Sequence, residues 1–286
     1  MLVSQFIVNP DKFKLSKCDP DFTGGMKRKD ARVKLEEDIE RMRELQDRFY
    51  AANTHALLLI LQARDAAGKD STIKHVLSGI NPSGCDVYSY KTPSSEELDH
   101  GYLWRHMTDL PRRGHIGIFN RSYYEEVTAV RVHPEFLAGQ RVPADLVTKN
   151  IWKERFEDIN AFERYLTRNG TRVIKFFLNV SRDEQKARFT ERIENPAKHW
   201  KFSDSDMKVR ALWDEYDDAF EDALRNTSTK HAPWYVVPAD HKWFTRLAVA
   251  DIIVNTLESV DPQYPAVTEK QIGSIAEATE ILANEG

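Results

Sequence analysis

The feature that most restricts the fold of this chain is a series of five short apolar runs, separated by longer stretches with helical periodicity. Strands that alternate with helices predict βαβ units, which build a parallel sheet covered by helices on both faces. The runs LLLIL and VIKFFL are almost continuously apolar, which is typical of central strands buried on both sides. We therefore predict a three-layer α/β/α fold with a five-stranded parallel sheet. The predicted strands are residues 55–61, 85–90, 116–120, 172–179 and 234–237.

The same pattern gives the organisation of the chain. A serine followed three residues later by glutamate, at Ser94 and at Ser181, predicts two helix starts. The other predicted helices cover residues 27–52, 70–78, 143–170, 203–226 and 241–260. We predict a single domain over residues 1–286, with a helical extension at 1–53, a lid inserted at about 182–210 and a weakly patterned tail at 262–286.

Composition argues against several functional classes. The net charge of −4 gives no overall positive field, so we predict no binding to nucleic acid. The longest apolar run is much shorter than the roughly 20 residues that span a bilayer, and the first residues do not resemble a secretory signal. The 2 cysteines are expected to be reduced thiols. We therefore expect a cytoplasmic protein without a membrane partner.

A possible phosphate-binding turn follows the first apolar run, in the sequence ARDAAGKD. It is similar to the pattern G-x-x-x-x-G-K-[ST], with alanine at the first glycine and aspartate after the lysine. Backbone N–H groups at such a turn and at the following helix N-terminus bind anions. The alternative is an ordinary strand-to-helix turn with a solvated lysine. The predicted phosphate-binding residues are Ala66, Ala67, Gly68, Lys69 and Asp70.

Two carboxylates in or beside this turn require an explanation. Asp70 would lie in the first helical turn, where the helix dipole favours a negative charge. Asp65 lies inside the turn and would repel a phosphate unless a divalent cation lay between them. Mg²⁺ is usually held by one or two carboxylates together with substrate phosphates. Asp65 therefore predicts phosphoryl transfer that depends on Mg²⁺, or on Mn²⁺ in its place.

A second group of polar residues follows the third apolar run, in the sequence GIFNRSYYEEV. Parallel strands end at one edge of the sheet, so Asn120, Arg121, Tyr124 and Glu125 are expected near Lys69. Arg121 suits the oxygens of a transferring phosphoryl group. We assign Asn120, Arg121 and Tyr124 to nucleotide binding. The predicted catalytic residues are Asp65, Lys69, Arg121 and Glu125, with Glu125 binding the metal or orienting the acceptor. The alternative is a helix N-terminus with favourable acidic residues.

The segment at 182–210 is locally basic, with eight lysines and arginines against six acidic residues. Arg188 and Arg192 are four residues apart and would share one helix face. Lys198 and Lys201 follow in a break between two helices. We predict a lid that brings these four cations onto the phosphates as it closes. An ordinary charged helical hairpin is the alternative.

Arg105 lies on a separate helical stretch and is predicted to contact the acceptor phosphate, although a solvated surface position is an equal alternative. Its neighbours Tyr102 and Trp104 are better explained as core residues than as a stacking platform. The histidines are scattered without an H-E-x-x-H pattern, and no G-x-S-x-G sequence is present. We therefore predict neither a zinc site nor a serine nucleophile of that type.

Three stretches together resemble the polyphosphate kinase 2 family: ARDAAGKDSTIKHVLSGINPSG, GIFNRSYYEEVTAVRVHPE and RFTERIENPAKHWKFSDSD. The similarity covers about residues 30–260. It implies a P-loop kinase-like fold with a helical lid. It also implies Mg²⁺-dependent transfer of a terminal phosphate between inorganic polyphosphate and a nucleoside mono- or diphosphate.

The resemblance also implies roles for single residues. Asp65 and Lys69 match the loop aspartate and lysine of the family, Arg121 matches the arginine after the second strand, and the lid cations match those that hold polyphosphate. Asn120 departs from members that have aspartate there. The sequence FNRSYYEE looks like the subgroup that phosphorylates both nucleoside mono- and diphosphates. We therefore place the predicted metal on Asp65 and Glu125.

Two other functions remain open at this stage. An ATP-dependent small-molecule or nucleotide kinase could use the same fold, and a non-catalytic module could bind polyphosphate without turnover. Transfer to a phosphate acceptor needs no strong general base, because that acceptor is already ionised near pH 7. We also expect a homo-oligomer, a dimer or a tetramer, although the sequence does not determine its size.

Overall fold

The computed structural model describes residues 3–285 and contains a single sheet of five parallel strands within them. The strand order is β2-β3-β1-β4-β5, so β1 lies at the centre. All eight residues of β1 are buried, which explains its apolar run from Ala56 to Leu61. The strands are β1 Ala56–Ala63, β2 Cys85–Ser89, β3 Ile116–Asn120, β4 Thr171–Asn179 and β5 Trp234–Pro238. The predicted fold class and the five predicted strands are confirmed.

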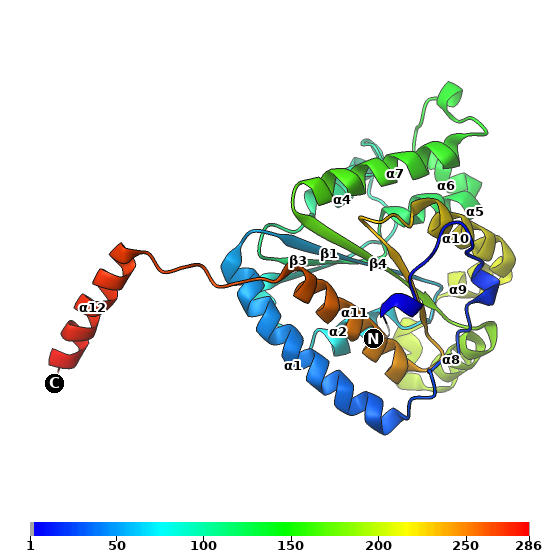
Figure 1. Cartoon of the computed structure of the whole chain (residues 1–286). Helices are drawn as coiled ribbons and strands as arrows, with labels where there is room; N and C mark the ends of the chain where they lie inside the picture. The colour runs from blue at the N-terminus through cyan, green and yellow to red at the C-terminus, as the bar shows by residue number, and fades with distance from the viewer. Residues whose placement is uncertain (1–2, 286) are drawn as a thin grey trace.

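Helices cover both faces of the sheet (Figure 1). The helices are α1 Arg28–Ala52, α2 Lys69–Val76, α3 Ser95–Leu98, α4 Trp104–Thr108, α5 Ala129–Val132, α6 Pro134–Gly139, α7 Ile151–Arg168, α8 Arg182–Glu194, α9 Asp204–Ala211, α10 Trp213–Thr227, α11 Lys242–Val260 and α12 Glu269–Asn284. Apolar side chains of α1, α2 and α11 pack on one face with Leu57, Leu59 and Leu61 of β1. Those of α7 and α10 pack on the other face with Leu58 and Ile60. The alternation along β1 thus builds two separate cores.

Two predicted helices are interrupted in the structure. Residues 143–150 form only a short 3₁₀ turn before α7, because they are largely exposed and have no apolar face to pack. The predicted helix at 203–226 is divided into α9 and α10 at Leu212. There the centre of the Trp213 indole ring lies 4.4 Å from the guanidinium of Arg64, the residue that directly follows β1.

The tail is more regular than its sequence suggested. Thr268 and Gln271 form a capping box at the start of α12. All described side chains of α12 are exposed, and Figure 1 shows the helix projecting away from the sheet. Within residues 3–285, no helix combines the length and the hydropathy required to cross a bilayer.

The carboxyl ends of the central strands place the polar segments at one edge of the sheet. Asn120, the last residue of β3, is paired with Leu61, which lies two residues before the end of β1. The turn at 64–68 follows β1 directly, and α8 begins shortly after β4. The parallel sheet therefore brings three segments together that are far apart in sequence.

The buried histidine His106 makes the stability of this fold sensitive to acid. Burial, with a smaller contribution from Arg105, lowers the pKa of His106 from 6.5 to about 3. Between these values the unfolded chain binds a proton that the folded chain does not. We expect the free energy of unfolding to fall by roughly 1 kcal/mol per pH unit from this group as pH decreases through that range.

His106→Phe should therefore reduce the pH dependence of unfolding below pH 6.5, measured by urea denaturation at pH 7.5 and pH 5. His75→Gln removes an exposed histidine and serves as the control. An unchanged pH dependence in His106→Phe would contradict the assignment.

Candidate active site

The turn between β1 and α2 has two residues in the left-handed region of backbone conformation. Ala66 has a φ of 60° and Gly68 a φ of 107°. Glycine adopts this conformation without a steric penalty, whereas alanine loses roughly 1–2 kcal/mol. The strained Ala66 therefore needs contacts that hold it in place.

Side chains of α8 supply these contacts from behind the turn. Gln185 Nε2 donates to the carbonyl oxygen of Asp65 at 2.9 Å. Arg188 Nη1 donates to the carbonyl oxygens of Ala66 at 3.0 Å and Ala67 at 2.7 Å. In a trans peptide the N–H group points opposite to the carbonyl. The N–H groups of Ala66 and Gly68 are therefore directed away from α8, which leaves them available to an anion.

The structure corrects the predicted role of Arg188. Its Nη2 donates to the carbonyl oxygens of Ala239 at 2.6 Å and Asp240 at 3.1 Å, and its Nε donates to Glu184 at 2.7 Å. With Nη1 occupied by the turn, the buried guanidinium has partners on all three nitrogens. Arg188 thus holds the loop and does not face a phosphate chain.

Lys69 lies at the junction of the turn and α2. Its Nζ donates to the carbonyl oxygen of Ala63 at 3.1 Å. Burial, followed by the positive charge of Arg121, lowers the pKa of Lys69, while Asp65 and Glu125 oppose this change. Phosphate oxygens near Lys69 would favour its charged form further.

Arg121 joins the two strand ends through ion pairs. Its Nη2 lies 3.0 Å from Asp65 Oδ1, and its Nη1 lies 3.7 Å from Glu125 Oε2. The charge of Glu125 is the main reason that the pKa of Arg121 is raised. With its amide oriented to satisfy both neighbours, Gln62 donates to Glu125 Oε1 at 2.9 Å. The structure therefore brings the four predicted catalytic residues, Lys69 included, into one cluster.

Asn120 and Asp70 form a second contact between the strand ends. Asn120 Nδ2 donates to Asp70 Oδ1 at 2.6 Å and to Ser89 Oγ at 3.3 Å. The Asn120 Oδ1 atom is buried without a hydrogen-bond partner. The Asp70 carboxylate is thus held by an amide, and only the backbone of Asp70 is suited to a phosphate.

Tyr124 does not face the cluster, so the structure corrects its predicted contact with nucleotide. The residue is 1% exposed, and its hydroxyl donates to Glu163 at 2.8 Å inside the core. Residues Tyr123–Val127 form a 3₁₀ turn, called η4, that directs Tyr123 and Tyr124 inward. The alternative reading of this stretch, a helix N-terminus with favourable acidic residues, anticipated a helical turn here but not the inward direction of the tyrosines.

The predicted lid consists of α8, a 3₁₀ segment at Pro196–Lys201 and α9. Arg192 Nη1 lies 3.2 Å from Asp206, and Lys198 forms an ion pair with Glu191. Lys201 lies 4.9 Å from the ring of Trp200, which is 79% exposed. In the structure these three cations contact other residues of the predicted lid.

Asp206 is the site residue that the sequence reasoning missed. Burial raises the pKa of Asp206, the charge of Asp65 raises it further, and Arg192, Arg121 and Lys69 lower it. This carboxylate therefore reaches the cluster from α9. Its position in the third family-like stretch, FSDSD, was the available signal.

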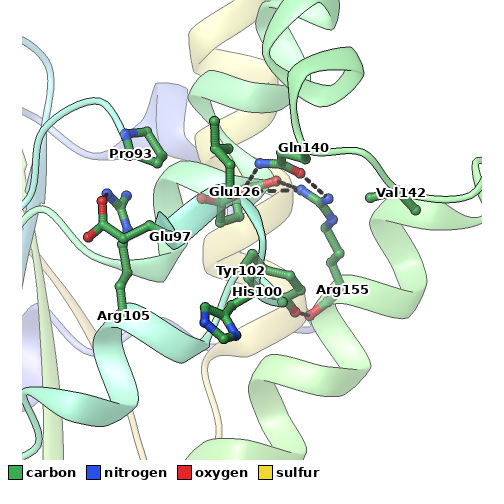
Figure 2. A pocket seen from close by; sticks show the side chains of 11 residues that line it. Pro93, Glu97, His100, Tyr102, Arg105, Glu126, Gln140, Val142 and Arg155 are labelled. Atoms are coloured by element: carbon green, nitrogen blue, oxygen red, sulfur yellow. Dashed lines mark hydrogen bonds and ion pairs between the residues drawn. The ribbon is translucent and has the colours of Figure 1, made fainter. Parts of the chain in front are cut away.

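Arg105 lines a cavity of about 110 Å³, whose walls also include Glu97, Glu126 and Arg155 (Figure 2). Its Nη1 donates to the carbonyl oxygen of Lys91 at 2.9 Å, just beyond the end of β2. On the opposite wall, Arg155 Nη1 donates to the carbonyl oxygen of Glu126 at 2.8 Å and Nη2 donates to Gln140 at 2.6 Å. Glu126 directly follows Glu125, so the cavity adjoins the cluster through η4.

The cluster offers a partial set of ligands for a metal ion. Among the residues that the structure describes, no three carboxylate, histidine or cysteine side chains converge as a ready-made ligand set. The available donors are Asp65, Glu125 and the unpartnered Asn120 Oδ1. This set fits Mg²⁺, which takes one or two carboxylates and completes its shell with phosphates and water.

Three features define a P-loop kinase-like phosphotransferase. A phosphate-binding turn follows the central strand β1, Arg121 follows the neighbouring strand β3, and a helical insertion follows β4. The family model described as polyphosphate kinase 2 (PPK2) matches residues 25–265. The chain belongs to the polyphosphate kinase 2 family.

Relatives and a solved structure agree with this assignment. An ADP-polyphosphate phosphotransferase of Rhodopseudomonas palustris is 53% identical over 235 residues, covering 82% of this chain and 81% of the relative. An AMP/ADP-polyphosphate phosphotransferase of Meiothermus ruber is 44% identical, covering 92% and 96%. The crystal structure of polyphosphate kinase 2 from Arthrobacter aurescens TC1 matches with a TM-score of 0.88 and 36% identity, covering 96% and 95%.

Arg188→Lys tests whether α8 organises the phosphate-binding turn. Lysine keeps the charge but cannot bond the loop carbonyls from a planar fork. Without these bonds the N–H groups of the turn would no longer be held toward the phosphate. We therefore expect kcat to fall roughly a hundredfold, while the KM for polyphosphate changes little.

Arg192→Lys, on the same helix, is the matched comparison and should mainly raise the KM for polyphosphate. Steady-state kinetics with varied polyphosphate distinguish the two variants. A raised KM with normal kcat in Arg188→Lys would show that Arg188 binds the substrate itself.

Proposed function

We propose that this protein transfers the terminal phosphate of inorganic polyphosphate to ADP, AMP or both, and catalyses the reverse reaction. The observation that carries the proposal is the cluster at the strand ends, where Lys69 and Arg121 meet Asp65 and Glu125 beside free loop N–H groups. The names of the relatives from R. palustris and M. ruber support the choice of substrates.

The residues of the cluster divide the work of positioning. The N–H groups of the turn and Lys69 hold oxygens of the donor phosphate. Arg121 binds the oxygens of the phosphoryl group in transfer, where its planar fork stabilises spreading negative charge. The acceptor phosphate is already an anion, so the protein contributes alignment and charge and no strong base.

Asp65 and Glu125 would hold Mg²⁺, or Mn²⁺ in its place. The ion would neutralise charge on the phosphates as they approach each other. Both carboxylates are paired with Arg121, so the same guanidinium keeps them oriented toward the cluster. Several phosphates would meet at this site, and their charge would require a metal ion in addition to Lys69 and Arg121. This requirement explains why two carboxylates lie among the cations.

The lid provides the remaining positive charge. Arg192 and Lys198 each have a single carboxylate partner, and Lys201 lies against an exposed indole. A polyphosphate chain, with several charges, can compete for all three side chains. Closure of the lid would then exclude water from the phosphoryl group.

The cavity beside the cluster suits the nucleoside of the acceptor. Pro93, Leu98 and Val142 give it apolar surface, while Glu97 and Arg105 offer an acceptor and donors of hydrogen bonds. A nucleobase has flat apolar faces and an edge with donors and acceptors, so its chemistry matches these walls. A cytoplasmic location and a homo-oligomeric assembly remain predictions.

Incubation with ADP, polyphosphate and Mg²⁺, with no ATP supplied, should give ATP, and AMP in place of ADP should give ADP. Chromatographic separation of the nucleotides identifies the products. Formation of no product would reject the proposal, and transfer only from added ATP would favour an ATP-dependent kinase.

Lys69→Ala should lower kcat by roughly two to three orders of magnitude, because a preorganised charge at the phosphoryl group is lost. Lys74→Ala removes an exposed lysine from the same helix and should retain activity. Polyphosphate binding without any turnover in the wild type would indicate the non-catalytic module.

Val142→Trp should fill the cavity and raise the KM for nucleotide at least roughly tenfold, which corresponds to about 1.4 kcal/mol of binding. Val147→Trp, at an exposed position on the same loop, is the control. Equal KM values for nucleotide in both variants would exclude the cavity as the nucleoside site, whereas a change in the KM for polyphosphate alone would assign it to the donor.

A further inference from the structure

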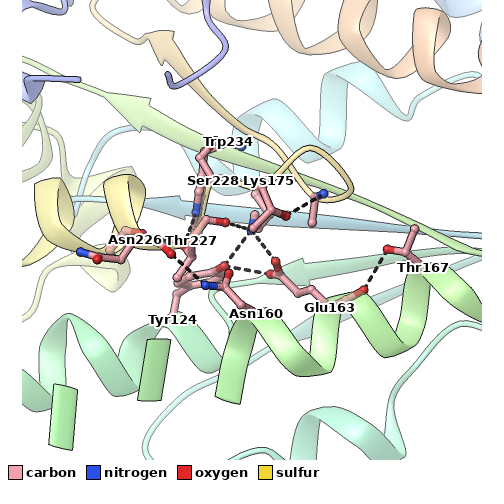
Figure 3. A network of polar contacts seen from close by, with 12 residues as sticks. Tyr124, Asn160, Glu163, Thr167, Lys175, Asn226, Thr227, Ser228 and Trp234 are labelled. Atoms are coloured by element: carbon pink, nitrogen blue, oxygen red, sulfur yellow. Dashed lines mark hydrogen bonds and ion pairs between the residues drawn. The ribbon is translucent and has the colours of Figure 1, made fainter. Parts of the chain in front are cut away.

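An ion pair between Lys175 of β4 and Glu163 of α7 lies in the core, away from the site cluster (Figure 3). Both side chains are 0% exposed, and Lys175 Nζ lies 2.5 Å from Glu163 Oε2. Removing two charges from water is costly, and apolar residues of similar size often stabilise a core equally well or better. Stability alone therefore does not explain this pair within the apolar strand VIKFFL.

Two tyrosines connect the pair to η4. Tyr123 Oη donates to Glu163 Oε1 at 3.0 Å, and Tyr124 Oη donates to the same oxygen at 2.8 Å. Lys175 Nζ in turn donates to Tyr124 Oη at 2.9 Å and to the carbonyl oxygen of Thr227 at 2.8 Å. Burial raises the pKa values of both tyrosines well above 10, so both remain hydrogen-bond donors.

The tyrosines are flanked in sequence by two residues of the site, Arg121 and Glu125. Arg121 has a φ of 65°, a left-handed conformation that is strained for arginine and persists only when the surroundings fix it. On the strand side, Arg121 N donates to the carbonyl oxygen of Leu61 at 3.0 Å. On the other side, the tyrosine hydroxyls bound to Glu163 hold the segment to the core.

We propose that Lys175 and Glu163 are positioning residues, which hold Tyr123 and Tyr124 and thereby fix Arg121 and Glu125 at the strand ends. This inference rests on the proposed phosphotransfer. A buried charge can hold two hydroxyls at a defined point, whereas an apolar contact permits rotation and sliding. The buried pair thus sets the geometry of the site from a distance, without contact with substrate.

The test uses the double variant Lys175→Met/Glu163→Leu, which replaces the pair with apolar side chains, and Tyr124→Phe, which removes one hydroxyl. We expect the double variant to fold and its kcat to fall between roughly tenfold and a hundredfold, with a smaller fall for Tyr124→Phe. The Mg²⁺ concentration for half-maximal rate should rise, because Glu125 is no longer fixed. Hydrogen exchange of the amides at 121–127 should accelerate in both variants.

Leu257→Ala serves as the control for lost stability. Leu257 is 0% exposed on α11, on the opposite face of the sheet, so this variant should lower Tm and leave kcat near the wild-type value at a temperature below Tm. The activity of the wild-type protein tests the proposed function. The ratio of the kcat of each variant to the kcat of the wild type tests the positioning role.

Normal kcat and normal exchange in a folded double variant would overturn the inference. A fall in kcat that tracks Tm equally in the double variant and Leu257→Ala would also overturn it, because the role would then be structural only. If the double variant does not fold, the test rests on Tyr124→Phe. A normal kcat and normal hydrogen exchange of the amides at 121–127 would overturn the inference. A lower kcat together with faster exchange would support it.

Discussion

The site depends on one constraint: the backbone of the turn after β1 must present its N–H groups to the strand-end edge. Gln185 and Arg188 meet this constraint by binding the carbonyl oxygens of three consecutive turn residues from the side of α8. The strained conformation of Ala66 is held by these bonds, since alanine alone does not favour it. Because α8 is also the first helix of the predicted lid, the turn and that segment share a support.

Charge balance follows the same arrangement. Arg121 lies between Asp65 and Glu125, and Lys69 lies close enough for its pKa to respond to all three. A site with cations only would repel a metal ion, and a site with carboxylates only would repel phosphates. The alternation of charges would let the cluster accept both under the proposed function. Asp206 of α9 lies near enough for the charges of Asp65, Arg121 and Lys69 to affect its pKa.

The fold was largely predictable because strand burial leaves a direct mark on sequence. A strand covered on both faces is mostly apolar, and β1 and β4 show this, with Gln62 and Lys175 as buried exceptions. Helix breaks were not predictable in the same way. Directly after the division at Leu212, Trp213 contacts Arg64, which is distant in sequence. The tail helix was missed because no apolar face of α12 is buried against the sheet.

The sequence by itself determined the strand-end cluster, because parallel strands end at one edge and the residues after each strand can be read directly. Only the tertiary structure decided where Arg188 and Tyr124 point. Both residues lie in polar or basic stretches of sequence, and both are buried in the structure. Arg188 binds carbonyl oxygens of the turn, and Tyr124 binds the core pair of Lys175 and Glu163. The physical reason is that a sequence pattern fixes the position of a residue along its element. The direction of its side chain is fixed by partners from other elements, and these meet only in the folded chain.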